Sequence, residues 1–125
     1  MTQKNNKTHK QKTYDRGLWA ENLAQAYLIV KGYRILEKRY KTKMGEVDII
    51  AKKKKSIIFI EVKSRQTQRQ ALESITPIAR RRIQGAALQY MSHKKLTDTA
   101  MRFDLITVVP PFNIQHLDNA WQAQA

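Results

Sequence analysis

Hydrophobic and polar positions form their clearest pattern in the middle of the chain. Two runs rich in β-branched residues, Val47–Ala51 and Ile57–Val62, flank four consecutive lysines at 52–55. Such runs favour β-strands, and only a solvent-exposed turn accommodates four adjacent lysines. The pattern therefore predicts a β-hairpin whose turn is centred between Lys54 and Lys55.

A turn at that centre brings acidic residues of the two strands together. It places Asp48 opposite Glu61, and Glu46 opposite Lys63. Because strand side chains alternate between faces, Glu46 and Asp48 are predicted to share one face, as are Glu61 and Lys63. Directly opposed Cβ atoms lie only about 4.5–5.5 Å apart, so two facing carboxylates repel each other. The predicted hairpin therefore places two acidic side chains, Asp48 and Glu61, where their negative charges repel each other.

A divalent cation between Asp48 and Glu61 would remove this repulsion, because hard cations such as Mg²⁺ prefer carboxylate oxygens. Lys63 beside such a site could hold a phosphate or an attacking water, which is the chemistry of metal-assisted phosphodiester hydrolysis. Ordinary ion pairs of Lys63 with Asp48 and Glu46 are the alternative interpretation. The lysine turn also lacks the glycine or asparagine that fixes a tight hairpin, and a slip of one residue would separate the acids.

Helical spacing predicts a helix before this hairpin, capped by Asp15, running to about Lys31 and stopped by Gly32. Its core face is predicted from apolar residues at helical spacing: Trp19, Leu23, Ala26, Tyr27 and Val30. A second stripe of Ala20, Ala24 and Leu28 widens the predicted buried surface.

A second helix is predicted after the hairpin, with Thr76 as its cap and Pro77 at its first position. Its packing stripe consists of Ile83, Ala86, Ala87, Tyr90 and Met91. The polar stretch Gln66–Gln70 between hairpin and helix lacks periodicity and is predicted to be a loop. The remaining predicted elements are strands at Tyr33–Tyr40 and Arg102–Val109, a short edge strand at Asn113–Leu117 and a final turn at Asn119–Trp121.

Composition limits the classes of protein to consider. The 125 residues suit one domain, predicted over 14–125 after a disordered basic tail over 1–13. No apolar run approaches the ~20 residues of a membrane span, and no signal peptide is recognisable, so a cytoplasmic protein that contacts no membrane is expected. With no cysteine, disulfides and thiolate metal sites are excluded.

The net charge of +14 favours an anionic partner such as nucleic acid. Basic residues near the hairpin and at the start of the second helix are candidates for phosphate contact: Lys43, Arg65, Arg80, Arg81 and Arg82. Each is equally explicable as a solvated surface charge. Asp104 is expected to pair with a neighbouring arginine, and His9, His93 and His116 are treated as incidental.

The segments GEVDII and IFIEVKSR resemble the active-site signature of the PD-(D/E)xK nucleases, the restriction-endonuclease-like superfamily. More narrowly, the chain resembles the YraN-like family of small uncharacterised bacterial proteins. Further matching segments are GLWAENLAQAYL, RRRIQGAALQYM, RFDLITV and IQHLDNAW. Together they cover nearly everything after the first dozen residues.

This resemblance implies an α/β fold with a three-layer core, in which a mixed central sheet is flanked by helices. It implies Asp48, Glu61 and Lys63 as catalytic residues. It also implies Mg²⁺ or Mn²⁺ held by Asp48 and Glu61, with Glu46 or Glu21 completing the shell. The expected activity is hydrolysis of DNA, with branched or flapped DNA as the expected substrate.

Two other functions are compatible with the same residues. The chain could be a non-catalytic nucleic-acid-binding module that assists recombination or repair, or a protein-interaction subunit whose charge serves solubility. The nuclease class also allows a homodimer that cuts both strands, although the sequence identifies no interface.

Overall fold

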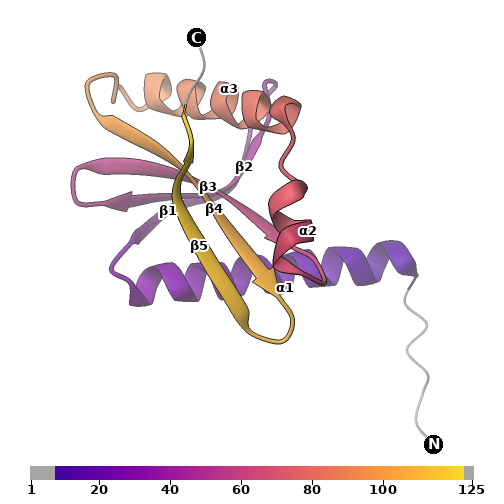
Figure 1. Cartoon of the computed structure of the whole chain (residues 1–125). Coiled ribbons are helices and arrows are strands. Elements are labelled where there is room, and N and C mark those ends of the chain that lie inside the picture. Colours follow the sequence, from indigo (N-terminus) through magenta and orange to yellow (C-terminus); the bar gives the residue numbers. More distant parts are fainter. Residues whose placement is uncertain (1–7, 123–125) are drawn as a thin grey trace, which may run out of the picture.

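A computed structural model describes residues 8–122 as a five-stranded sheet with helices on both faces (Figure 1). The strands lie in sequence order: β1 (Arg34–Lys41), β2 (Glu46–Lys53), β3 (Ser56–Ser64), β4 (Ala100–Val109) and β5 (Asn113–Trp121). β3 and β4 are parallel, and the other neighbours are antiparallel. Helix α1 (His9–Val30) covers one face and α3 (Pro77–His93) the other, while the short α2 (Gln68–Glu73) contacts β3 and β4. The predicted α/β architecture, a mixed sheet flanked by helices, is confirmed.

The predicted register of the central hairpin is also confirmed. Ile49 pairs with Ile60, and Lys53 pairs with Ser56, so a two-residue turn is formed by Lys54 and Lys55. Lys54 has φ 55°, the left-handed conformation that such tight turns require. Burial of both strands sets this register, because a slip of one residue would turn their apolar side chains to the wrong faces.

The sheet separates two hydrophobic clusters. On β3, Ile58, Ile60 and Val62 pack in the cluster beneath α1, whereas Ile57 and Phe59 pack in the cluster beneath α3. Both faces of this strand are therefore covered, which explains its nearly continuous apolar sequence. The predicted β1 and β4 are confirmed, and β4 lies between β3 and β5 as expected of a strand covered on both faces.

The predicted start of α1 at Asp15 is wrong. The helix begins at His9, because the Thr8 hydroxyl accepts a hydrogen bond from the Gln11 backbone N–H at 3.1 Å, and the Gln11 side chain accepts one from the Thr8 N–H at 2.9 Å. These first turns are polar and carry no apolar periodicity. Residues 1–7 of the predicted tail lie outside the described residues.

The predicted core face of α1 is confirmed for Trp19, Leu23 and Tyr27, which are partly buried against the cluster beneath the helix, and wrong for Ala26 and Val30. The buried residues of α1 are Ala20, Ala24 and Leu28, the stripe expected to be secondary, while Val30 is 85% exposed and Ala26 is exposed as well. Small alanines let the helix approach the sheet closely, so the stripe with the smaller side chains becomes the contact surface. The larger apolar residues flank this contact or face away from it.

The second half of the chain contains one helix that the sequence did not reveal. Residues predicted as a loop form α2, capped by the Thr67 hydroxyl, which accepts from the Gln70 N–H at 3.1 Å. The predicted start of α3 is confirmed, since Thr76 caps it and Pro77 is its first residue. Its predicted packing stripe is buried throughout. Within residues 8–122, no helix combines the length and apolarity needed to cross a membrane.

The C-terminal residues form one edge strand, where a short strand and a separate turn were predicted. β5 continues to Trp121, with an irregular pairing near Asn119, which has φ 51°. Trp121 stacks on Phe103 with ring centroids 5.5 Å apart. The predicted packing of Trp121 onto the domain is confirmed.

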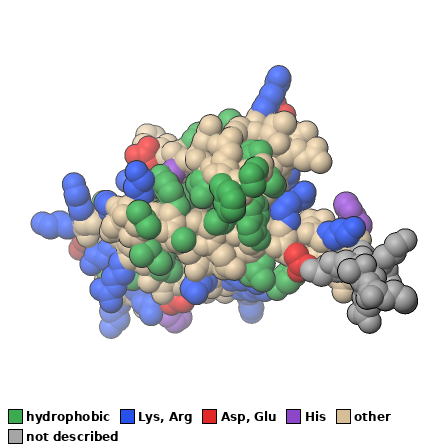
Figure 2. Space-filling view, turned by 90° about the horizontal axis from the view of Figure 1, so that it is seen from below, with side chains coloured by type: hydrophobic (Ala, Val, Ile, Leu, Met, Phe, Trp, Pro, Cys, Tyr) green, Lys and Arg blue, Asp and Glu red, His purple; other side chains and the backbone are tan. Residues whose placement is uncertain are grey.

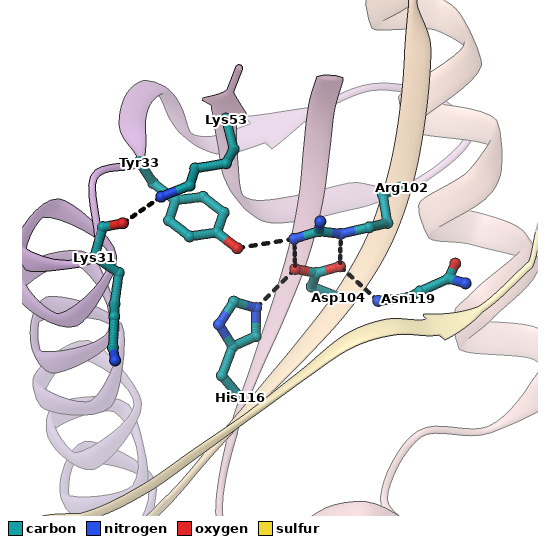
Figure 3. A network of polar contacts seen from close by, with 7 residues as sticks. All are labelled: Lys31, Tyr33, Lys53, Arg102, Asp104, His116 and Asn119. Carbon is teal, nitrogen blue, oxygen red and sulfur yellow. Dashed lines mark hydrogen bonds and ion pairs between the residues drawn. The ribbon is translucent and has the colours of Figure 1, made fainter. Parts of the chain in front are cut away.

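A buried polar network ties β5 to β4 and to the segment after α1 (Figure 3). Arg102 donates two hydrogen bonds to Asp104, at 2.7 and 2.8 Å, and one to the Tyr33 hydroxyl at 2.9 Å. His116 Nε2 lies 2.7 Å from Asp104 Oδ2, and the Asn119 N–H donates to Oδ1 at 2.9 Å. The expected Asp104–arginine pair is confirmed, whereas the treatment of His116 as incidental is wrong.

This network satisfies a carboxylate that is fully buried. Burial of Asp104 opposes its ionisation, but hydrogen bonds from His116 and Arg102 outweigh that effect and lower the pKa of the Asp104 carboxyl below its ordinary value. The charge therefore stabilises the fold through its partners.

We expect Asp104→Asn to lower the free energy of unfolding by about 3 kcal/mol, because it leaves Arg102 without its charged partner in a buried site. Urea unfolding at neutral pH measures the change. Glu73→Gln is the matched control, since Glu73 forms an exposed pair with Arg69 that contributes little. A loss for Asp104→Asn no larger than for this control would contradict a stabilising role.

A candidate carboxylate site at the end of the β2–β3 hairpin

The candidate site forms where β2 separates from β3. The last recorded pair of this end of the hairpin is Ile49 with Ile60. At the next position, Asp48 Oδ2 accepts a hydrogen bond from the Val62 backbone N–H at 2.8 Å. A side-chain carboxylate thus takes the place of a main-chain acceptor, which fixes Asp48 against β3.

The alternation of side chains in β2 breaks at the same residue. Val47 packs in the cluster beneath α3 and Ile49 in the cluster beneath α1, although residues two apart in a regular strand share a face. On the neighbouring β1, Arg39 has φ 51°. Because of this irregularity, the prediction that Glu46 and Asp48 share a face is wrong: the two acids line different cavities.

The first cavity lies on the α1 side and has a volume of about 230 Å³. Asp48 and Glu61 both line it, and their carboxyl groups are within hydrogen-bonding reach of each other, as the register predicted. Lys63 also lines it, with Nζ 3.6 Å from Glu61 Oε1. The fold therefore assembles the three residues predicted to be catalytic.

Burial makes this carboxyl pair unusual. The pKa of Glu61 is raised from an ordinary 4.5, first by burial and then by the charge of Asp48 and the hydrogen bond with it. Lys63 opposes the rise without cancelling it. At neutral pH the pair therefore retains a proton, or binds a cation in its place.

Glu21 lines the same cavity, but its carboxylate is hydrogen-bonded to Arg39. Its two carboxylate oxygens accept hydrogen bonds from Arg39, each at 3.3 Å. Burial raises the pKa of Glu21, the Arg39 hydrogen bond lowers it, and the charges of Asp48 and Glu46 raise it further. Glu21 is thus close enough to interact electrostatically with Asp48, while its oxygens are held by Arg39.

The acidic side chains of the first cavity supply some, but not all, of the protein ligands of a divalent-metal site. Across residues 8–122, no three side chains of His, Cys, Asp or Glu converge into a metal-binding group. Asp48 and Glu61 alone supply a pair of facing carboxylates, and Mg²⁺ is commonly held by one or two carboxylates with water completing its octahedron. The donor set therefore suits Mg²⁺ or Mn²⁺, with Glu21 and Glu46 nearby but not assembled with the pair.

A second cavity of about 390 Å³ adjoins the pair on the α3 side. Glu46, Thr76 and Arg82 line it together with Glu61 and Lys63, which border both cavities. Glu61 and Lys63 of β3 therefore lie where the two cavities meet, one cavity beside α1 and the other beside α3.

Gly45 allows α3 to close this second cavity. A Cβ atom at Gly45 would lie 2.4 Å from the Arg82 carbonyl oxygen, so only glycine permits the approach. The backbone of α3 therefore approaches the connection between β1 and β2 directly at this glycine.

The predicted phosphate-binding residues divide into two groups. Arg65 lines the first cavity and Arg82 the second, so both border the carboxyl pair. Arg80 and Arg81 line a separate cavity beside Trp121, and Arg80 lies 5.9 Å from the Trp121 ring. The predicted cluster of three arginines therefore faces two directions.

Two further residues stand apart from this division. Lys43 is exposed in the connection between β1 and β2. Arg16 was missed by the sequence reasoning, and it lines the first cavity together with Gly17 and Glu21. The sequence did contain a signal for this cavity wall: Gly17 and Glu21, four residues apart, lie on one helix face, and Arg16 is next to Gly17.

We expect the stability of the metal-free protein to fall as pH rises. Folding raises the pKa of Glu61 to about 9, so its contribution is complete below the unfolded value near 4.5 and is lost as pH rises through the folded value. Each unit of pKa difference corresponds to about 1.4 kcal/mol. Urea unfolding in EDTA between about pH 5 and pH 9 should show a decline of at least that size relative to Glu61→Gln, which is neutral throughout. Parallel curves for the two proteins would show that Glu61 is ionised normally.

Comparison with known proteins gives the family of this chain. The model of the uncharacterised protein family UPF0102, which is the YraN-like family, matches residues 20–108. A UPF0102 protein of Maricaulis maris is 45% identical over 107 residues, which cover 85% of this chain and 84% of the relative. One from Mesorhizobium japonicum is 41% identical over 113 residues, covering 90% of each chain. The chain belongs to the UPF0102 family.

Proposed function

We propose that this protein is a metal-dependent nuclease that hydrolyses phosphodiester bonds of DNA in the cytoplasm. The observation that supports this proposal best is the apposition of the partly buried Asp48 and Glu61, with Lys63 Nζ 3.6 Å from Glu61. Two partly buried acids side by side destabilise a fold unless a proton or cation joins them. A lysine at the same point adds a donor for phosphate or water, and the same three residues carry the resemblance to the PD-(D/E)xK nucleases.

In this mechanism, Asp48 and Glu61 would hold Mg²⁺ or Mn²⁺. Bound there, the metal would supply Lewis acidity toward the phosphate and toward the attacking water. Lys63 would orient that water or stabilise negative charge developing on the phosphate. Glu46 or Glu21 would complete the shell, although neither lies with the carboxyl pair in a group of three within the described chain.

Arginines on either side of the pair extend the site along a substrate. Arg65 and Arg16 border the cavity beside α1, and Arg82 borders the cavity beside α3. Phosphates before and after the scissile bond would contact these guanidinium groups. The charge of +14 gives further support for a polyanionic substrate, and branched or flapped DNA, with accessible single strands, is the form we propose.

Metal binding can be tested separately from cleavage. We expect Mg²⁺ to raise the melting temperature of the wild type, since a ligand that binds only the folded state stabilises it by about 2.7 kcal/mol at 100 times its dissociation constant. Asp48→Asn and Glu61→Gln should lose this response. Asp98→Asn, which removes an exposed acid away from the site, should retain it. Equal stabilisation of all four proteins would place metal binding elsewhere.

Cleavage should be measured on supercoiled plasmid, single-stranded DNA, a flap, a four-way junction and RNA, each with Mg²⁺, Mn²⁺ or EDTA. We expect metal-dependent cutting by the wild type and none by Asp48→Ala, while Lys63→Met should cut about 100-fold more slowly. Asp98→Asn, purified identically, is the control for contaminating nucleases. Cutting that survives in Asp48→Ala would exclude this site.

A non-catalytic nucleic-acid-binding module is the second candidate. The observation that favours it is that only two acids converge in the described part of the chain, while Arg39 holds Glu21. DNA binding that is unchanged by EDTA and by Asp48→Ala, together with no cleavage of any substrate, would support this function over the first.

A further inference from the structure

The outer face of α1 is apolar and uncovered. We define this outer face as Leu18, Trp19, Asn22, Ala26, Ile29 and Val30, on the side of α1 away from the alanine-rich face that packs on the sheet. Trp19 lies at its rim, because it also packs against the cluster beneath α1. Leu18, Ile29 and Val30 are 37%, 59% and 85% exposed. Viewed from the α1 side, hydrophobic side chains gather across the middle of the molecule, and lysines and arginines lie mainly toward its periphery (Figure 2).

A shallow groove marks the N-terminal half of this face. Its volume is about 470 Å³, and it is lined by Asp15, Leu18, Trp19, Asn22 and Leu23. Contiguous apolar surface of this kind on a small protein is typical of an interaction site. Ala26 and Val30, which the helical periodicity predicted to be buried, are exposed on this face.

The outer face carries no charge between Leu18 and Val30, and Asp15 is an acid at its N-terminal end. Between Gly17 and Val30 the only charged residue is Glu21, and its carboxylate faces Arg39 and the carboxylate cavity. A nucleic acid would require cations here, and an interfacial membrane helix would require lysines or arginines along its flank. Copies of a chain with net charge +14 repel each other over most of their surface, so a charge-free face is where they can meet.

The pattern of the outer face is also self-complementary. Leu18 and Ile29 lie on one flank of this face, eleven residues apart, and Trp19 and Val30 lie on the other flank with the same spacing. In an antiparallel helix pair related by a twofold axis level with Ala24, Leu18 meets Ile29 of the second copy, and Trp19 meets Val30. Each apolar residue therefore meets an apolar residue.

We propose that two copies of this chain associate through the outer face of α1, with the two helices antiparallel. The stripe is about 18 Å long, so the contact is smaller than the roughly 800 Å² per partner of a standard interface. The dimer is accordingly weak, with a dissociation constant in the range of about 1–100 µM. This association does not depend on the proposed nuclease activity.

Sedimentation velocity of the full chain over a concentration series tests the proposal. We expect a monomer–dimer equilibrium that persists at about 0.5 M NaCl, where charge repulsion is screened. Ile29→Glu should raise the dissociation constant at least 10-fold. Leu88→Glu is the matched control, because Leu88 is 50% exposed on α3 and should leave the equilibrium unchanged.

Disulfide cross-linking tests the orientation, because the chain has no cysteine of its own. A mixture of Leu18→Cys and Ile29→Cys chains should cross-link on oxidation. Leu18→Cys alone should not, since an antiparallel pair separates the two copies of position 18 by about 18 Å along the axis, beyond the ~7 Å limit between Cα atoms.

A wild type that stays monomeric at about 100 µM, well within the expected range, overturns the proposal. It is also overturned if Leu88→Glu weakens the dimer as much as Ile29→Glu does, or if Leu18→Cys alone cross-links as efficiently as the mixture. A monomer that binds vesicles of phosphatidylglycerol through this face would make it a membrane surface instead.

Discussion

The hydrogen bond from the Val62 N–H to the Asp48 carboxylate is the interaction on which the arrangement of the site depends. It replaces a main-chain contact where β2 leaves β3, and it holds Asp48 beside Glu61 at the end of the hairpin. Repulsion between two carboxylates would ordinarily push such strands apart. Here the apolar remainder of the hairpin is buried on both faces, so its register is fixed and the acids remain close.

Asp104, which is fully buried, and Glu61, which is partly buried, have opposite electrostatic surroundings. Asp104 accepts hydrogen bonds from Arg102 and Asn119 and contacts His116, so burial is compensated and its pKa falls. Glu61 lies beside another carboxylate with Lys63 as its basic partner, and burial raises its pKa. A compensated charge stabilises structure, whereas an uncompensated one costs stability and is characteristic of a site that binds or reacts. This contrast separates the structural acid from the candidate functional one.

Helix α1 connects the carboxylate site with the exposed surface of the molecule. Its inner face packs on the sheet through small residues, and its Glu21 lines the carboxylate cavity. Its outer face presents Leu18, Ile29 and Val30 to solvent. A single sheet can bury only one face of a helix, so a helix with two apolar stripes leaves one of them for another partner.

The sequence by itself determined β1 to β4, the hairpin register, the start of α3 and the pairing of Asp48 with Glu61. These follow from local patterns: β-branched apolar runs around a lysine turn and a Thr-Pro cap. It did not determine the start of α1 or the existence of α2, because polar capping segments carry no apolar period. Only tertiary structure decided which stripe of α1 is buried, and that the side chains of Glu46 and Asp48 line different cavities. Choosing between two apolar stripes depends on the shape of the sheet, and the break at Asp48 depends on a neighbouring strand distant in sequence.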